Sequence, residues 1–176
     1  MAFVDGGYLR GLCRVLRCDC TNFSSLYDLL RRKFNSIPKN QFRGDIIRIY
    51  YYDAIVDDEH PEHGRQRKYF DSIADNSQFC TIRLGKLVDS SNKGFKQKGV
   101  DILMSVDAIT KAYLDQYDVG IFLMGDADFK PLIEAVKDVG KKTLCLYYPT
   151  NSSRELTRIF DMRETLDLNE IRLFMA

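Results

Sequence analysis

The feature that most limits the fold of this chain is a series of short apolar runs that alternate with longer amphipathic segments. The first run, residues 2–5, ends in Asp5 followed by two glycines, which is typical of a buried strand that stops at a tight turn. Residues 119–124 repeat the pattern and stop at Gly125 and Asp126. Because strands that alternate with helices form a parallel sheet covered on both faces, the pattern predicts an α/β fold.

The same reading predicts a central, mainly parallel sheet of about five strands. These strands are expected at residues 2–5, 45–56, 79–87, 119–124 and 143–148. Three helices are expected in the first half of the chain: one that begins at about residue 9, one that begins after Ser24, and one that ends at about Asn76. Three more are expected over 100–117, over 132–139, and from a cap at Ser152 or Ser153 to Phe160. With 176 residues and no linker or repeat, one domain spanning residues 1–176 is expected.

Composition limits the partners and the compartment. Lys and Arg total 26 against 25 Asp and Glu, so binding to a polyanion would need a local basic patch. No stretch approaches the roughly 18 apolar residues of a membrane helix, so no membrane partner is expected. The five cysteines are odd in number and the opening residues do not resemble a secretion signal, which favours a reducing cytoplasm. Cys13, Cys18 and Cys20 are close in sequence and could hold a soft metal, but no second ligand pair with the usual spacing follows. We therefore interpret them as reduced or incidental thiols.

Four carboxylates stand out by their positions. Asp5 and Asp126 end predicted strands, Asp128 begins the helix that follows, and Asp101 begins the predicted helix over 100–117. The carboxyl ends of parallel strands share one edge of a sheet, and clustered carboxylates repel each other unless a cation compensates them. An all-oxygen set favours Mg²⁺ or Mn²⁺, the ions that assist phosphodiester hydrolysis.

Each of these acids also has a simpler interpretation. Asp5 could make an Asx-turn with the glycines that follow it, and Asp128 could cap a helix. Asp101 could act only on the helix dipole. The joint occurrence of the four acids at strand and helix ends favours a metal site.

Three segments carry a resemblance to a known family. Phe3-Val4-Asp5-Gly6-Gly7-Tyr8-Leu9, Lys98-Gly99-Val100-Asp101 and Gly125-Asp126-Ala127-Asp128-Phe129, followed by Pro131-Leu132, resemble in order the motifs of the NYN domain family, which is related to PIN-domain nucleases and includes the LabA-like proteins. The resemblance implies a PIN-like three-layer α/β/α sandwich, RNA as partner and metal-dependent ribonuclease activity. It also implies Asp5, Asp101, Asp126 and Asp128 as catalytic ligands of Mg²⁺ or Mn²⁺.

Two positions differ from the family pattern, and two more are predicted to support the metal ligands. Tyr8 stands where the family often has Asn, and Met124 replaces a frequent Ser or Thr. Asp107 matches a recurrent family position, although an ion pair with Lys111 four residues later is an equally good account. Ser153 is the other predicted supporting residue.

A basic loop precedes Asp101 directly. Lys93, Lys96 and Lys98 could contact phosphates, and Phe95 could stack on a base. A solvated loop would have the same composition, but its position next to Asp101 favours substrate binding.

The leading hypothesis is hydrolysis of RNA phosphodiester bonds by metal-activated water. One alternative is a non-catalytic PIN-like module that binds RNA or a protein. A magnesium-dependent phosphohydrolase is a further alternative, although the chain has no Gly-x-x-x-x-Gly-Lys-Ser/Thr loop. A homo-oligomer is left open.

Overall fold

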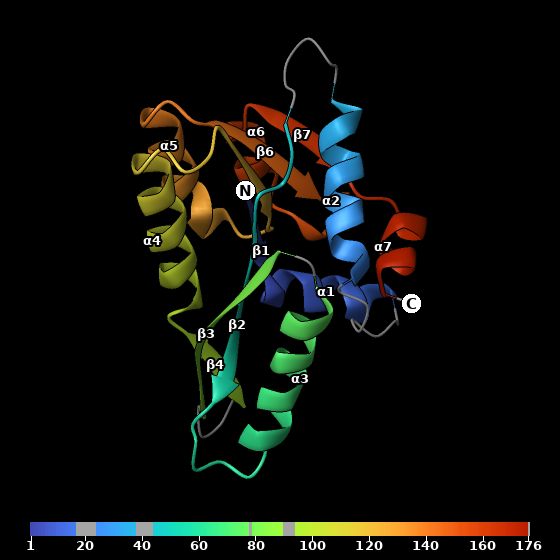
Figure 1. Cartoon of the computed structure of the whole chain (residues 1–176), viewed down its shortest axis with the longest axis vertical. Coiled ribbons are helices and arrows are strands. Elements are labelled where there is room, and N and C mark those ends of the chain that lie inside the picture. The colour runs from blue at the N-terminus through green and yellow to red at the C-terminus, as the bar shows by residue number, and fades with distance from the viewer. Residues whose placement is uncertain (17–23, 38–43, 78, 90–93, 176) are drawn as a thin grey trace.

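The computed structural model describes residues 1–16, 24–37, 44–77, 79–89 and 94–175, and a seven-stranded sheet runs through its centre (Figure 1). The strands are β1 (Ala2–Asp5), β2 (Ile49–Val56), β3 (Cys80–Asp89), β4 (Phe95–Lys98), β5 (Val119–Leu123), β6 (Lys142–Tyr147) and β7 (Met162–Thr165). Their order across the sheet is β4-β3-β2-β1-β5-β6-β7. β4 pairs antiparallel with β3, and the other neighbouring strands pair in parallel.

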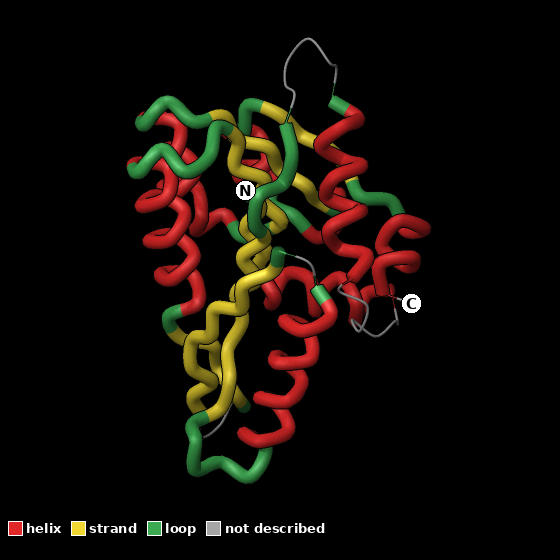
Figure 2. The backbone as a smooth tube through the Cα atoms, in the orientation of Figure 1, coloured by secondary structure: helices red, strands yellow, loops and turns green. Residues whose placement is uncertain are grey.

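Helices cover both faces of this sheet (Figure 2). They are α1 (Gly6–Leu16), α2 (Ser24–Ser36), α3 (His63–Asn76), α4 (Val100–Tyr113), α5 (Lys130–Asp138), α6 (Arg154–Ile159) and α7 (Leu168–Met175), with short 3-10 helices η1 (Ala127–Phe129) and η2 (Pro149–Asn151). α1, α2, α3 and α7 contribute to one core, and α4, α5 and α6 contribute to the other. The molecule therefore has three layers, as predicted.

The position of β1 between two layers of helices explains why its residues are apolar at successive positions. Ala2 and Val4 face one core and Phe3 faces the other, and all three are fully buried. A strand with helices on both faces needs apolar side chains on both sides of its pleat.

The strand order reverses between β1 and β5. From β1 the chain builds outward through β2 and β3, whereas β5, β6 and β7 build outward on the other side. Parallel sheets bind ligands in the crevice beyond the carboxyl ends of strands at such a point. Asp5 ends β1, and Asp126 lies just beyond β5. The two acids therefore flank the reversal.

The prediction of five strands is wrong by two edge strands. β4 occupies part of the segment predicted as a basic loop, and β7 follows the last predicted helix. Both are short and polar, so their pairing depends on the neighbouring strand more than on their own hydrophobicity.

The structure bears on the expected state of the cysteines and on the expected lack of a membrane helix. The prediction of reduced thiols is wrong at Cys13, which is disulfide-bonded, whereas Cys80 and Cys145 are free. Cys18 and Cys20 lie outside the described residues. Within the described part of the chain, no helix combines the length and the apolar character needed to cross a membrane.

Candidate metal centre at the carboxyl edge of the sheet

Asp5 lies where β1 turns directly into α1. Its Oδ1 accepts a hydrogen bond of 2.8 Å from the backbone N–H of Gly7, so the Asx-turn considered from the sequence is present. Burial raises the pKa of the Asp5 carboxyl to about 6, and the charge of Asp101 also raises it. The backbone N–H groups of Tyr8 and Gly7 and the charge of Arg10 lower this pKa. Asp5 is thus a carboxylate whose negative charge is poorly compensated.

Asp126 and Asp128 lie at the start of η1, just beyond β5. Asp126 Oδ1 accepts a hydrogen bond of 3.0 Å from the backbone N–H of Asp128, so Asp126 caps this helix. The capping role considered for Asp128 therefore belongs to Asp126. The side chain of Asp128 is exposed and lies in the first turn.

Asp101 lies in the first turn of α4, two residues after the N-cap residue Gly99. Gly99 has a φ of 81°, a left-handed conformation that favours glycine. Partial desolvation raises the pKa of the Asp101 carboxyl, and the charges of Asp126 and Asp128 raise it further. Asp101 is therefore the electrostatic neighbour of Asp5 on one side and of Asp126 and Asp128 on the other.

The donor set of this acidic edge suits a hard divalent cation, because every candidate atom is a carboxylate oxygen. Among the described residues, no group of three or more His, Cys, Asp or Glu side chains converges closely enough to hold an ion directly. Mg²⁺ commonly retains several waters and takes few protein ligands, so a site of this openness fits it through water-mediated contacts.

Tyr8 joins the turn after β1 to the turn after β5. Its hydroxyl is 2.7 Å from Ser152 Oγ and accepts a hydrogen bond of 2.8 Å from the backbone N–H of Tyr148. A Cβ placed on Gly125 would lie only 2.4 Å from Tyr8 Cε2, so the ring packs against bare backbone. The tyrosine that departs from the family pattern therefore has a positioning role.

The other two residues considered as support have clear structural partners. Ser153 donates its backbone N–H to the Gly125 carbonyl at 2.9 Å, and its Oγ caps α6 by accepting from Leu156 N at 3.4 Å. The Asp107 carboxylate pairs with Lys111 at 3.3 Å and with Arg83 at 3.1 Å. The ion pair between Asp107 and Lys111, considered as the alternative account of Asp107, is therefore present.

Met124 does not face the acidic edge. Its side chain is fully buried and belongs to the core beneath α4 and α5. The residue that replaces the family's frequent hydroxyl thus contributes to packing.

The residues predicted to bind substrate lie mainly on β4 instead of on a loop. Lys96 and Lys98 are exposed, and Phe95 and Gln97 alternate with them along the strand. Lys93 lies outside the described residues.

Asp53, which was not predicted as a functional residue from the sequence, is fully buried beside α1. Its carboxylate forms an ion pair with Arg10 and accepts hydrogen bonds from Tyr51 Oη at 2.9 Å and from Gln97 Nε2 at 3.1 Å. The backbone N–H of Ala54 is a further donor. A buried acid needs such partners, so the presence of Asp53 within the apolar strand predicted at residues 45–56 was a signal of a buried ion pair.

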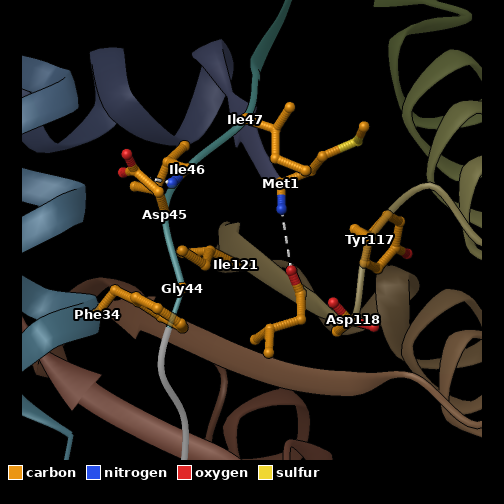
Figure 3. A pocket seen from close by; sticks show the side chains of 10 residues that line it. Met1, Phe34, Gly44, Asp45, Ile46, Ile47, Tyr117, Asp118 and Ile121 are labelled. Carbon is orange, nitrogen blue, oxygen red and sulfur yellow. Dashed lines mark hydrogen bonds between the residues drawn. The ribbon is translucent and has the colours of Figure 1, made fainter.

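Figure 3 shows a different pocket, at the opposite edge of the sheet where the strands begin. It has a volume of about 90 Å³, and Met1, Ile46 and Tyr117 are among its lining residues. The Met1 ammonium group donates to the Val119 carbonyl at 3.0 Å, and burial lowers the pKa of this amine to about 6, while the charge of Asp118 opposes that shift. None of the four candidate acids lines this pocket.

A central, mainly parallel sheet with helices on both faces is the α/β/α architecture of the PIN-like, nuclease-type fold class. The family model of the NYN domain matches residues 1–167, and the chain belongs to this family, which is part of the PIN-like superfamily. The fold is similar to the crystal structure of a protein of unknown function from Vibrio parahaemolyticus, with a TM-score of 0.59 and 19% identity over 94% of this chain and 91% of that one. No curated protein matches the chain in sequence.

Proposed function

We propose that this protein is a divalent-metal-dependent ribonuclease that hydrolyses RNA phosphodiester bonds. Asp5, Asp101, Asp126 and Asp128 are assigned as direct or water-mediated ligands of Mg²⁺ or Mn²⁺. The observation that carries the proposal is the position of Asp5 at the end of β1 and of Asp126 just beyond β5, on either side of the strand-order reversal. Burial raises the pKa of the Asp5 carboxyl, with a smaller contribution from Asp101, and desolvation raises the pKa of Asp101, with contributions from Asp126 and Asp128. A divalent cation would compensate the repulsion between these carboxylates.

The acids, Tyr8 and the lysines at this edge of the sheet have separate roles. When bound, the divalent ion supplies positive charge that favours attack by water and stabilises the leaving oxygen. Asp5 Oδ1 and Asp126 Oδ1 accept hydrogen bonds from backbone N–H groups at 2.8 and 3.0 Å, which orients the two carboxylates that would hold the ion. Tyr8 keeps the two turns in register by its contact with Gly125. Lys96 and Lys98 are assigned to the RNA backbone.

Isothermal titration of Mn²⁺ into the purified protein tests the site. We expect saturable binding in the parent protein and weaker binding in Asp126→Asn, because this substitution removes one negative charge from the acidic edge. Asp138→Asn is the matched control, since Asp138 is exposed on α5 away from the four acids. Equal Mn²⁺ binding by the two variants would contradict the assignment.

A further inference from the structure

A pocket of about 500 Å³ opens beside Asp5, between α1, α3 and β4. Its volume lies within the range of about 300–1,000 Å³ that is usual for small-ligand sites. We call it the Arg14 pocket and define it by Gly7, Arg10, Arg14, Tyr69, Phe95 and Gln97. Gly7 belongs both to this pocket and to the turn that binds Asp5, so a ligand here lies next to the acidic edge.

The pocket carries an uncompensated positive charge. None of the described residues that line it is acidic, and Arg10 is neutralised by its ion pair with the buried Asp53. Among the residues that the structure describes, Arg14 has no ion-pair partner and is exposed. The charge distribution therefore favours an anionic ligand, with Arg14 as its contact.

The remaining walls suit a planar base. Phe95 is 52% exposed and Tyr69 is 36% exposed, so both rings are accessible to a ligand in the pocket. His60 supports the Phe95 ring edge-on, with ring centroids 5.5 Å apart. Exposed aromatic rings beside a positive groove are the elements with which proteins bind unpaired bases.

A fixed hydrogen-bond acceptor completes the pocket. Gln97 Nε2 donates to Asp53, so the opposite Oε1 atom is oriented, and it lies 3.2 Å from the position that a Cβ on Gly7 would take. The lack of a side chain at Gly7 keeps the path between Oε1 and Asp5 open.

We propose that the Arg14 pocket binds one nucleotide of single-stranded RNA, with Arg14 contacting its phosphate and Phe95 and Tyr69 stacking on its base. The inference rests on the proposed function, because it places the neighbouring phosphodiester at the acidic edge. Single-stranded RNA is the substrate class it selects, since a base inside a duplex cannot reach the rings.

The test measures binding of a short unstructured RNA by fluorescence anisotropy across a salt series, in chelator so that metal-dependent cleavage is suppressed. Arg14→Ala should lower the affinity and flatten the log–log salt slope by about 0.7, the value for one phosphate contact on a single strand. Phe95→Ala should lower the affinity about tenfold without changing that slope, because stacking carries no charge. Arg163→Ala on β7, at the opposite edge of the sheet, is the control and should match the parent protein.

The outcomes separate the pocket from the ribonuclease. If the parent protein cleaves RNA but Arg14→Ala and Phe95→Ala bind like Arg163→Ala, the pocket assignment is overturned and the function stands. If the parent protein binds RNA through Arg14 and Phe95 yet does not cleave it with Mn²⁺, the ribonuclease proposal fails and the pocket stands. Equal affinity for double-stranded RNA, or no RNA binding, would overturn the pocket assignment.

Discussion

The ring of Tyr8 packs against the backbone of Gly125 so closely that a Cβ there would come within 2.4 Å of Tyr8 Cε2. Tyr8 follows β1 and Gly125 follows β5, so this contact joins the two strand ends that carry Asp5 and Asp126. The distance between the acids is therefore coupled to the packing of one tyrosine on one glycine.

Tyr8→Phe should destabilise the protein by about 1–3 kcal/mol. The substitution keeps the ring but leaves the Tyr148 N–H and Ser152 Oγ without their partner, and partly buried polar groups without partners cost about this much. Tyr113→Phe is the control, since Tyr113 is 79% exposed. Chemical denaturation checks the difference, and equal unfolding midpoints for the two variants would contradict the role given to the Tyr8 hydroxyl.

Asp53→Asn should lower the free energy of unfolding by about 2–4 kcal/mol. Removing one partner of a buried ion pair leaves the other charge uncompensated, although Arg10 is 34% exposed and recovers part of its hydration. Asp71→Asn breaks an exposed helical ion pair with Arg67 and should cost about 0.5 kcal/mol or less. A comparable loss in both variants would show that Asp53 is not a special anchor for Arg10 and Gln97.

Asp5→Asn should change how stability depends on pH. The pKa of folded Asp5 is about 6 against an ordinary value of 3.8, so the folded protein holds this proton more tightly than the unfolded chain. The stability from this proton is complete below about pH 4 and is lost as the pH rises through about 6, up to about 3 kcal/mol for two pKa units. Asn keeps the acceptor for the Gly7 N–H but cannot ionise.

Denaturant unfolding in chelator at a series of pH values measures this effect. Relative to the parent protein, Asp5→Asn should lose less stability between pH 4 and 7 and should be more stable at pH 7. Asp138→Asn should follow the parent curve. A parallel curve for Asp5→Asn would mean that Asp5 does not carry a raised pKa.

The strands beside the site could be predicted because both of their faces are buried. β1 and β5 read as apolar runs that stop at an acid or a glycine, and the structure reproduces β1 at its predicted bounds. β4 and β7 could not be predicted in this way. Residues such as Lys96 and Arg163 alternate on exposed edge strands, whose pairing is decided by the strand alongside.

Only part of the site could be predicted from the sequence, because some of its contacts join residues that are distant along the chain. The places of Asp5 and Asp126 in the fold could be predicted because they follow from where β1 and β5 end. Asp53 lies within an apolar run, and its partners Arg10 and Gln97 are distant in sequence, so only the fold shows that they meet. A charged residue within a predicted buried strand is a signal to look for such a partner.

The most direct test of the central claim is single-turnover cleavage of RNA with Mn²⁺ and with chelator, comparing the parent protein, Asp126→Asn and Asp138→Asn. We expect the parent protein and Asp138→Asn to cleave RNA with Mn²⁺ and to stop in chelator. Asp126→Asn should remain folded and should cleave slower by about a hundredfold or more, equal to about 2.7 kcal/mol of transition-state stabilisation. A parent protein that does not cleave with Mn²⁺, or an Asp126→Asn variant that cleaves as fast as Asp138→Asn, would contradict this claim.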